Sequence, residues 1–421
     1  MIADNQGRTF LRLLAELRPH LRTDRNLPAR IQQRLTKEKR FGSRDRRLYR
    51  ELLYTAIRHL PWIETLLARS EDDVLRAVVW LAVDDPATRP LKQGLPADWP
   101  PLPATVAAKA AHLGVTEPLL PEWFRPHCPA AFESPEIDVL NTRAPLWLRL
   151  QVDDPRSVFE EFSFRQWSWS PAAANPVGPD LASAPSSSAS KRPPIPGAVE
   201  AFTQSDLTKT DAYERGEFEV QDLGSQLLLE AVGPAPGSRW LDACAGAGGK
   251  TLQLARLVGP TGHIDAIDPR STALAELKVR ANRAHLTQIT VRQHPPAPDA
   301  LYDGVLIDAP CSGTGTWRRF PQLKWSTVEA DITTGAQRQR EILARYASHV
   351  RPGGLLVYAT CSLSHVENED VVADFLAAHP EFAPATFART FGVSVGKFGL
   401  TLLPSLHNTD GFFVAALRRA P

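Results

Sequence analysis

Hydrophobic residues recur at helical spacing along the first part of the chain, from Thr9 to about Ala82. Apolar side chains three or four positions apart share one face of an α-helix, so this pattern predicts amphipathic helices that pack on one another. Proline-rich sequence at residues 86–103 interrupts the pattern, and further apolar, helical segments run to about residue 132. We therefore expect an all-helical domain over residues 1–135.

A second pattern begins at residues 146–152, where polar and apolar side chains alternate as in a half-buried strand. Residues 154–162 then have helical spacing, so we predict a small α/β subdomain over residues 140–215. Within it, residues 170–196 are dense in alanine, serine and proline. Such a composition buries too little apolar surface to build a core, and we expect a flexible insertion there.

From residue 216 onward, short apolar strands alternate with amphipathic helices. The expected strands are residues 239–243, 263–267, 304–307, 354–359 and 412–417, and the expected helices are residues 251–258, 271–285 and about 336–349. This alternation calls for a mostly parallel sheet with helices on both faces. We therefore predict the α/β class, with a doubly wound catalytic domain over residues 216–421.

Composition adds limits on the class of protein. The 421 residues are long for a single core, which favours two or three domains. The four cysteines are widely spaced without any Cys-x-x-Cys pair, so neither a disulfide framework nor a zinc ribbon is indicated. There is no signal-peptide pattern and no apolar run of about 18 residues. We expect a cytoplasmic monomer that binds no metal and no membrane.

The net charge of +1 conceals a local excess of basic residues. Between Arg30 and Arg58 there are ten lysines and arginines against three acids, a local net charge of +7. Such clustering is typical of a surface that faces a polyanion. A solvated helix face without a partner would give the same pattern, and the charge count does not decide between the two.

A glycine-rich segment follows the strand expected at residues 239–243. Small residues between a strand and a helix let the backbone approach a ligand and present helix N-terminal amides to it. The spacing fits neither a Walker loop nor a full dinucleotide fingerprint. The candidate cofactor-binding residues in this segment are Cys244, Ala245, Gly246, Ala247, Gly248, Gly249 and Lys250.

Asp268 ends the next expected strand and strengthens the prediction of a cofactor site. An acid at this place can accept hydrogen bonds from both ribose hydroxyls of a nucleoside cofactor. Its other interpretation is a helix N-cap ahead of Pro269 and Ser271. The two roles are compatible with each other.

Two cysteines each close an apolar strand ahead of small, turn-forming residues: Cys311 in the segment 308–315 and Cys361 in the segment 360–362. Reacting groups of open parallel sheets gather at the carboxyl ends of the strands, so this placement suggests covalent catalysis. A free cysteine is more commonly a buried apolar residue without chemistry. We favour that interpretation for Cys128 and Cys244.

Together, the segments 244–250, 308–315 and 360–362 resemble the signature of the S-adenosylmethionine-dependent RNA cytosine-C5 methyltransferases. The resemblance also takes in residues 318–325, 367–369 and 410–413, and so spans most of residues 218–417. Within the family, the whole chain resembles the bacterial 16S ribosomal RNA methyltransferase B group, with its NusB-like helical domain. It implies a Rossmann-like class I methyltransferase fold, S-adenosylmethionine as cofactor, and helical and small α/β units that bind RNA.

The resemblance also implies roles for single residues. Cys361 would be the nucleophile that adds to carbon 6 of cytosine, and Cys311 would assist release of the methylated product. Asp308 would hydrogen-bond the N3 and amino edge of the base as well as line the cofactor site. Lys250 would lower a thiol pKa or position the base. Within the segment 318–325, Arg318 and Lys324 are expected to be surface cations or contacts to RNA phosphates.

Two residues depart from the family pattern. Ala247 stands where the family often has proline, which leaves the backbone amides available. His294 stands near the place of an acidic residue that contacts the adenine amino group, and Asp299 is too far along the chain to substitute for it. We therefore expect weaker cofactor binding with the chemistry retained.

Methylation of carbon 5 of a cytosine in 16S ribosomal RNA is the leading hypothesis, and transfer RNA is the nearest alternative substrate. Because a DNA cytosine-C5 enzyme would not need the Cys361 thiol, the second cysteine argues against that class. A non-catalytic RNA-binding ribosome assembly factor is a further alternative, suggested by His294. Retention of Cys311, Cys361 and Asp308 argues against it.

Overall fold

The computed structural model describes residues 2–172, 195, 197–203 and 205–421. The chain divides into two compact units, and the second contains most of residues 144–315 together with residues 330–421. Most of the insertion expected at residues 170–196 lies outside the described residues. No helix of the described residues is long and apolar enough to cross a membrane.

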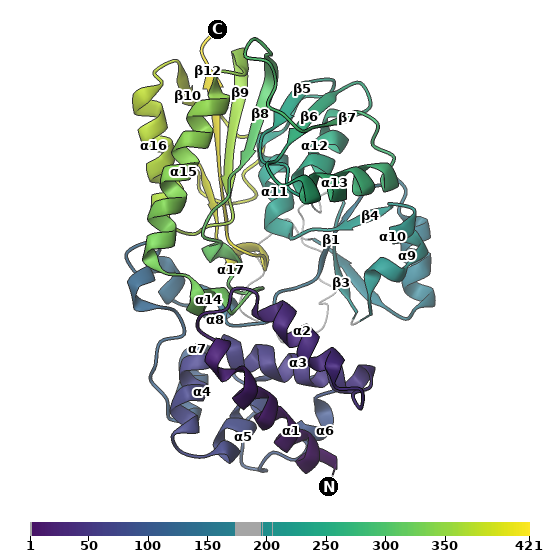
Figure 1. Ribbon diagram of the computed structural model, residues 1–421, viewed down its shortest axis with the longest axis vertical. Coiled ribbons are helices and arrows are strands. Elements are labelled where there is room, and N and C mark those ends of the chain that lie inside the picture. The colour runs from purple at the N-terminus through teal and green to yellow at the C-terminus, as the bar shows by residue number, and fades with distance from the viewer. Residues whose placement is uncertain (1, 173–194, 196, 204) are drawn as a thin grey trace. The chain divides into compact units, whose positions relative to one another are not determined.

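The first unit is helical and contains residues up to Arg143 together with Thr316–Glu329. Its helices bury their apolar faces against one another, with Phe10, Leu52 and Ile57 fully inaccessible to solvent. The helical spacing of apolar residues therefore corresponds to amphipathic helices that pack on one another, as predicted. The helices are α1 (Ile2–Leu17), α2 (Leu27–Lys37), α3 (Ser43–Arg58), α4 (Leu60–Leu67), α5 (Glu71–Leu81), α6 (Arg89–Lys92), α7 (Val106–Leu113), α8 (Glu136–Leu140) and α14 (Leu323–Ser326) (Figure 1).

The second unit begins with a small antiparallel sheet in the strand order β2-β3-β1-β4. Helix α9 (Arg156–Phe164) packs on it through Val158 and Phe162, which share a core with Leu148 and Phe218. The strand and helix expected between residues 146 and 162 are thus present. The strands are β1 (Trp147–Leu150), β2 (Ser168–Pro171), β3 (Ala198–Phe202) and β4 (Phe218–Val220), and the short helix α10 (Asp211–Glu214) lies between β3 and β4 along the chain.

A large sheet in the order β10-β12-β9-β8-β5-β6-β7 forms the rest of this unit, with β11 paired to β12. Strands β9, β8, β5, β6 and β7 are parallel, whereas β12 runs antiparallel to β9. All five expected strands are present, and β7, β10 and β11 are additional. The strands are β5 (Arg239–Asp242), β6 (His263–Ile267), β7 (Ile289–Arg292), β8 (Tyr302–Asp308), β9 (Val350–Thr360), β10 (Phe382–Pro384), β11 (Leu400–Leu402) and β12 (Phe412–Arg419).

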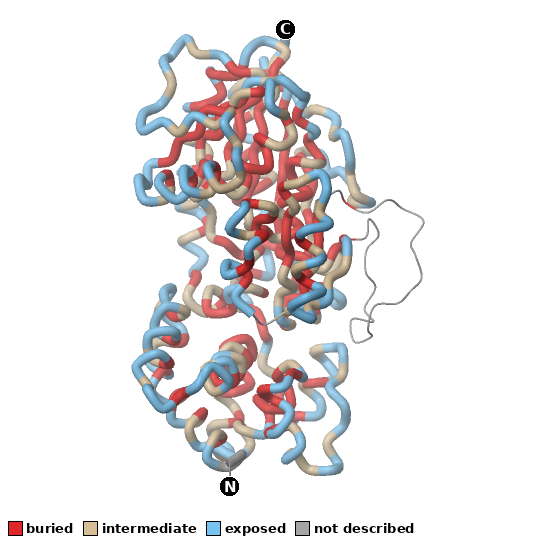
Figure 2. Tube along the Cα trace, turned by 90° about the vertical axis from the view of Figure 1, so that its right-hand side faces the viewer, coloured by how far each residue is buried: buried red, intermediate tan, exposed pale blue. Residues whose placement is uncertain are grey.

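Helices cover both faces of this sheet, because the strand side chains alternate between two cores. Trp240, Leu306 and Val357 pack with α11 (Leu223–Val232) and α12 (Gly249–Val258). Their chain neighbours, such as Leu241 and Ile307, pack on the opposite face with α15 (Glu329–Ala347) and α16 (Glu369–Ala378). Buried residues accordingly follow the strands (Figure 2). The doubly wound α/β class is confirmed.

All three helices expected in this domain have bounds that differ from the expected ones, and α12 begins two residues early, at Gly249. Helix α13 (Ser271–Arg283) ends two residues early, whereas α15 begins at Glu329 rather than near residue 336. The first two turns of α15 contain threonines and a glycine, which are weak helix formers, and burial of Ile332 stabilises them. The earlier start lengthens the helix that faces the loops after β5 and β8.

Candidate functional site

A cavity of about 870 Å³ lies at the carboxyl ends of β5, β6 and β8. Its lining brings together most of the predicted cofactor-binding residues: Cys244, Ala245, Gly246, Ala247, Gly249, Lys250, Asp268 and Asp308. Gly248 is not part of the lining, but it occupies the N-cap position of α12. Residues that are far apart in the sequence therefore share one pocket at the sheet edge that the sequence indicated.

The loop between β5 and α12 depends on glycine for its shape. Gly246 and Gly248 have positive φ angles of 52° and 92°, a region that L-residues with a side chain rarely adopt. A Cβ on Gly248 would also lie 2.7 Å from a Leu252 methyl and 2.8 Å from Leu277. The loop can thus turn tightly and expose its backbone to the cavity.

Asp268 holds this loop through its carboxylate, which accepts a 2.9 Å hydrogen bond from the Gly246 amide. Partial burial acts to raise its pKa, but hydrogen bonds from Arg270 and from Gly246 outweigh burial and hold the pKa below its usual value. Arg270, not Asp268, occupies the N-cap position of α13. The N-cap interpretation of Asp268 is therefore wrong, and an ionised acceptor remains at the cavity wall.

Asp242, at the end of β5, is a lining residue to which the sequence reasoning gave no role. It is only 1% exposed, and its carboxylate accepts a 2.7 Å hydrogen bond from the Thr251 hydroxyl. Burial raises the pKa of Asp242 to about 7, although the Thr251 bond opposes the shift. An acid in an otherwise apolar strand, directly before a glycine-rich loop, was the available signal for it.

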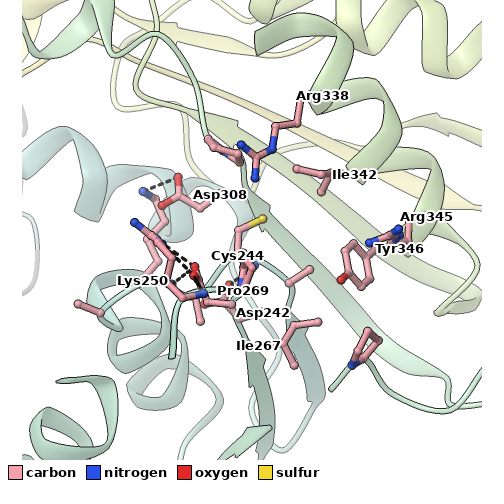
Figure 3. Close-up of a pocket in the computed structure, with 18 of the residues that line it drawn as sticks. Asp242, Cys244, Lys250, Ile267, Pro269, Asp308, Arg338, Ile342, Arg345 and Tyr346 are labelled. Atoms are coloured by element: carbon pink, nitrogen blue, oxygen red, sulfur yellow. Dashed lines mark hydrogen bonds and ion pairs between the residues drawn. The ribbon is translucent and has the colours of Figure 1, made fainter. Parts of the chain in front are cut away.

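Lys250 and Asp308 form an ion pair across the cavity, with Nζ 2.9 Å from Oδ1 (Figure 3). The Lys250 ammonium also lies 5.5 Å from the centroid of the Phe412 ring. Among the described residues, no hydrogen bond or ion pair joins Lys250 to a cysteine. Its observed contact is with the carboxylate at the end of β8, and this orients Asp308 at the cavity rim.

The two candidate catalytic thiols are neighbours, with Cys311 Sγ 3.3 Å from Cys361 Sγ. Their loops are joined directly: the Gly315 amide donates to the Cys361 carbonyl at 2.9 Å, and the Thr314 and Ser362 hydroxyls are 3.0 Å apart. The hydrogen bond with Cys361, burial and the negative charge of a Cys361 thiolate raise the pKa of Cys311 well above its usual value. One thiol of this pair can therefore donate a hydrogen bond to the sulfur of the other.

The other two cysteines have different surroundings. Cys128 is buried in the helical unit. Cys244 lines the cavity, where burial and nearby carboxylates raise its pKa. The surroundings of Cys244 therefore disfavour a thiolate. Within the part of the chain that the structure describes, no group of three or more His, Cys, Asp and Glu side chains is arranged to hold a metal ion.

Helix α15 supplies the cavity wall opposite the glycine-rich loop. Arg338, Ile342 and Tyr346 all point from this helix toward the cavity (Figure 3). The sequence reasoning assigned these residues no role, because a helix face has no motif of its own. His294 lines the cavity after β7 as a solvent-exposed side chain, whereas Asp299 is not part of the lining.

Arg318 and Lys324 are not surface cations, contrary to expectation. Arg318 is 3% exposed, and its guanidinium donates to the Thr142 hydroxyl and the Arg143 carbonyl. Lys324 is fully buried in the helical unit. Side chains this deeply packed do not present their charge to a phosphate at the protein surface, so the predicted phosphate contacts are wrong for both.

Comparison with known proteins supports one family. The model of the 16S rRNA methyltransferase RsmB/F domain matches residues 229–418. A probable ribosomal RNA small subunit methyltransferase B of Synechocystis sp. is 36% identical over 226 residues, covering 51% of this chain and 50% of the relative. A ribosomal RNA small subunit methyltransferase B of Yersinia pseudotuberculosis is 32% identical over 287 residues, covering 67% and 61%.

The chain spans about half to three-fifths of the length of these curated relatives. The crystal structure of the protein PH0851 superposes with a TM-score of 0.68 at 21% identity, covering 92% of this chain and 93% of that one, which supports the fold. The expected resemblance and the expected cofactor class are confirmed. Through residues 229–418, the chain is similar to the RsmB/F family of 16S rRNA methyltransferases, and this similarity supports S-adenosylmethionine as its cofactor.

Proposed function

We propose that this protein methylates carbon 5 of a cytosine in RNA, with 16S ribosomal RNA as substrate and Cys361 as covalent nucleophile. The observation that carries the proposal is the 3.3 Å separation of the Cys311 and Cys361 thiols beside a cavity of cofactor size. The relatives named as ribosomal RNA small subunit methyltransferases support the choice of RNA.

The cavity residues suit S-adenosylmethionine, which carries a sulfonium and an ammonium group. The carboxylates of Asp242, Asp268 and Asp308 all lie in the lining, and the glycine-rich loop leaves backbone amides accessible. A volume of about 870 Å³ is ample for a nucleoside with an amino-acid arm. When bound, the cofactor supplies an electrophilic methyl group.

The two thiols would divide the remaining chemistry. Carbon 5 of cytosine is a poor nucleophile, and addition of the Cys361 thiolate to carbon 6 converts the ring into an enamine that can accept the methyl group. Asp308, oriented by Lys250, would hold the N3 and amino edge of the base during this addition. After transfer, a base takes the carbon-5 proton, the electron pair restores the 5,6 double bond and the Cys361 thiolate leaves, with Cys311 assisting this release.

The protonation of the pair supports these assignments. A protonated Cys311 can donate a hydrogen bond to Cys361 Sγ, which stabilises a thiolate there. With the roles exchanged, the partner with the raised pKa would have to be the nucleophile, and the thiolate is the reactive form. The raised pKa of Cys311 agrees with the assignment of addition to Cys361, which the family resemblance implies.

RNA would meet the basic sequence of α2 and α3, and its target base must be single-stranded or flipped to expose carbon 6. Not all ten basic residues are available: Arg30 pairs with Asp24 at 2.7 Å, Arg34 pairs with Glu16 at 2.6 Å, and Arg58 is buried. Arg44 of α3 is exposed, and its guanidinium donates to the neutral Pro86 carbonyl rather than to an acid, so it is a better candidate for a phosphate contact.

The experiment is methyl transfer from labelled S-adenosylmethionine to unmodified 16S ribosomal RNA, with transfer RNA in parallel and nucleoside mass spectrometry of the product. Wild type should form 5-methylcytosine, and Cys361→Ala should lose at least about 1,000-fold in rate, as expected for a missing nucleophile. Cys128→Ala is the control for thiol removal. RNA binding without any transfer by wild type would favour the assembly-factor alternative.

A further inference from the structure

A buried carboxylate lies directly behind the two cysteine loops. Glu367 ends the 3₁₀ turn His365–Glu367 and is 0% exposed. Taking a carboxylate out of water is costly unless hydrogen-bond donors surround it. Within the described residues no lysine or arginine forms an ion pair with it, so neutral donors satisfy this charge.

The donors come from both cysteine loops. Oε1 of Glu367 accepts from the Ser312 amide at 2.8 Å, and Oε2 accepts from the Ser312 hydroxyl. The same Oε2 accepts from the Ser362 hydroxyl at 2.6 Å. Ser312 follows Cys311 and Ser362 follows Cys361 in the chain. One carboxylate group therefore joins the residues that come directly after the two thiols.

Other contacts fix the carboxylate from behind. Gln339 of α15 donates to Glu367 Oε1 at 3.0 Å and also to the Pro310 carbonyl at 3.0 Å. The Tyr358 hydroxyl donates to the Glu367 carbonyl. A Cβ added to Gly335 would lie 2.5 Å from Oε1, so the helix backbone closely approaches the carboxylate. The Glu367 carboxylate therefore has little room to move.

We propose that Glu367 is the positioning residue that sets the separation and relative orientation of the Cys311 and Cys361 thiols. It acts through Ser312 and Ser362, not on the substrate. That this separation of the thiols matters for catalysis rests on the proposed function. The separation itself can be tested by a reaction of the thiols that needs no methyl transfer.

Glutamine in place of Glu367 would keep the shape and change the hydrogen bonding. The amide retains one acceptor oxygen, while its NH₂ group is a donor that would face donors of Ser312 or Ser362. The serine hydroxyls that now donate to one carboxylate oxygen would have to reverse their role and accept from the amide NH₂, so the hydrogen bonds that join the two loops would be rearranged. A displacement of about 1 Å at the reacting groups is enough to cost about 100-fold in rate.

The test uses phenylarsine oxide, in which arsenic binds two neighbouring thiols and loses its oxygen as water. Full-length wild type, Glu367→Gln and the control Glu369→Gln are treated, and peptide mass spectrometry follows the Cys311–Cys361 bridge. In Glu367→Gln we expect bridging to slow about 10-fold and kcat for methyl transfer to fall about 100-fold. The dissociation constant of S-adenosylmethionine should stay within about 2-fold, and Glu369→Gln should match wild type.

Ser362→Ala is the second variant, because it removes one hydrogen bond from the carboxylate and leaves the other donors in place. If Glu367→Gln does not fold, Ser362→Ala tests the proposal in its place. It should slow formation of the Cys311–Cys361 bridge by a smaller factor than Glu367→Gln does. Wild-type bridging and kcat in folded Glu367→Gln, or wild-type bridging in Ser362→Ala when the first variant is unfolded, would overturn the proposal. Glu367-dependent bridging without methyl transfer by wild type would support the positioning role and refute the proposed function.

Discussion

Two carboxylates of the cofactor cavity differ in protonation although both end neighbouring strands. Asp268 is held ionised by Arg270 and the Gly246 amide, whereas burial raises the pKa of Asp242 to about 7. The difference follows first from burial: Asp242 is 1% exposed, and the Thr251 hydroxyl together with a 3.3 Å contact from the Cys244 amide does not offset the cost of burying its charge. Near neutral pH, Asp242 can therefore respond to a cationic ligand by releasing its proton.

Asp242→Asn should flatten the pH dependence of stability. The folded pKa of about 7 exceeds the unfolded value of about 4, so the folded state binds the extra proton and the free energy of unfolding falls as pH rises from about 4 to about 7. This contribution is on the order of 4 kcal/mol and constant above pH 7. Urea unfolding at pH 5 and pH 8 should show a smaller difference for the variant than for wild type. An equal difference in both proteins would contradict the assignment.

His294→Asp should strengthen cofactor binding. The exposed imidazole lines the cavity where the family resemblance implies an acid, and a carboxylate there would supply an acceptor for an amino group of the ligand. One such hydrogen bond is worth about 1 kcal/mol, or about 5-fold in affinity. Titration calorimetry with S-adenosylmethionine measures the change, with Asp299→Asn, outside the lining, as control. Equal affinities of His294→Asp and wild type would show that His294 is not the reason for weak binding.

At the scale of elements, the loops after β8 and β9 are joined closely enough to exclude a side chain. A Cβ on Gly315 would lie 2.1 Å from the Gly411 carbonyl oxygen and 2.8 Å from that of Cys361. Both neighbours are backbone atoms and cannot rotate away. Gly315 therefore permits close contact between three chain segments, in addition to its place in a loop.

Gly315→Ala should separate the thiol loops. We expect a loss of about 2–3 kcal/mol in the free energy of unfolding, because the strain must be relieved by backbone movement, and a fall in methyl transfer larger than any change in cofactor affinity. Denaturant unfolding and kinetics measure the two effects. Gly42→Ala is the control, since its Cβ would meet only Asp45 Oδ2 at 3.8 Å. Unchanged activity in Gly315→Ala would refute the need for this close approach.

The sequence predicted the elements of the catalytic domain well because strand and helix periods are local properties. Strands such as Arg239–Asp242 and the glycine-rich loop could be placed from a few residues each. The wall of the cavity formed by Arg338 and Tyr346, and the role of Glu367, could not, because they depend on which segments meet in three dimensions. Charge alone also misled, since Arg318 and Lys324 are buried.

At the scale of the whole molecule, Thr316–Glu329 belongs to the helical unit although it directly follows the Cys311 loop in the chain. Trp317 in this segment is fully buried, with its ring 4.7 Å from that of Phe124. Lys324 Nζ donates to the carbonyls of Arg58 and Leu119 and to Asn141 Oδ1. The segment is thus part of the packing of the helical unit. A domain defined as one continuous stretch of sequence, such as residues 1–135, cannot include it.

Lys324→Met should destabilise the helical unit. Methionine matches the length of the side chain but leaves three buried oxygen atoms without their shared donor, at a cost of about 2–4 kcal/mol. Burial also lowers the pKa of Lys324 well below its usual value, so its solvated charge is not what stabilises the unit. Thermal unfolding measures the loss, with the exposed Lys278→Met as control. Wild-type stability in Lys324→Met would contradict the packing role.

The measurement that tests the central claim most directly is covalent trapping on 16S ribosomal RNA. Cys311→Ala, incubated with unmodified RNA and S-adenosylmethionine, should accumulate a protein–RNA adduct that survives denaturing electrophoresis, because product release is impaired. The adduct should disappear in Cys361→Ala and in the double variant. An adduct that forms in Cys361→Ala, or that persists in the double variant, would contradict the assignment of Cys361 as nucleophile.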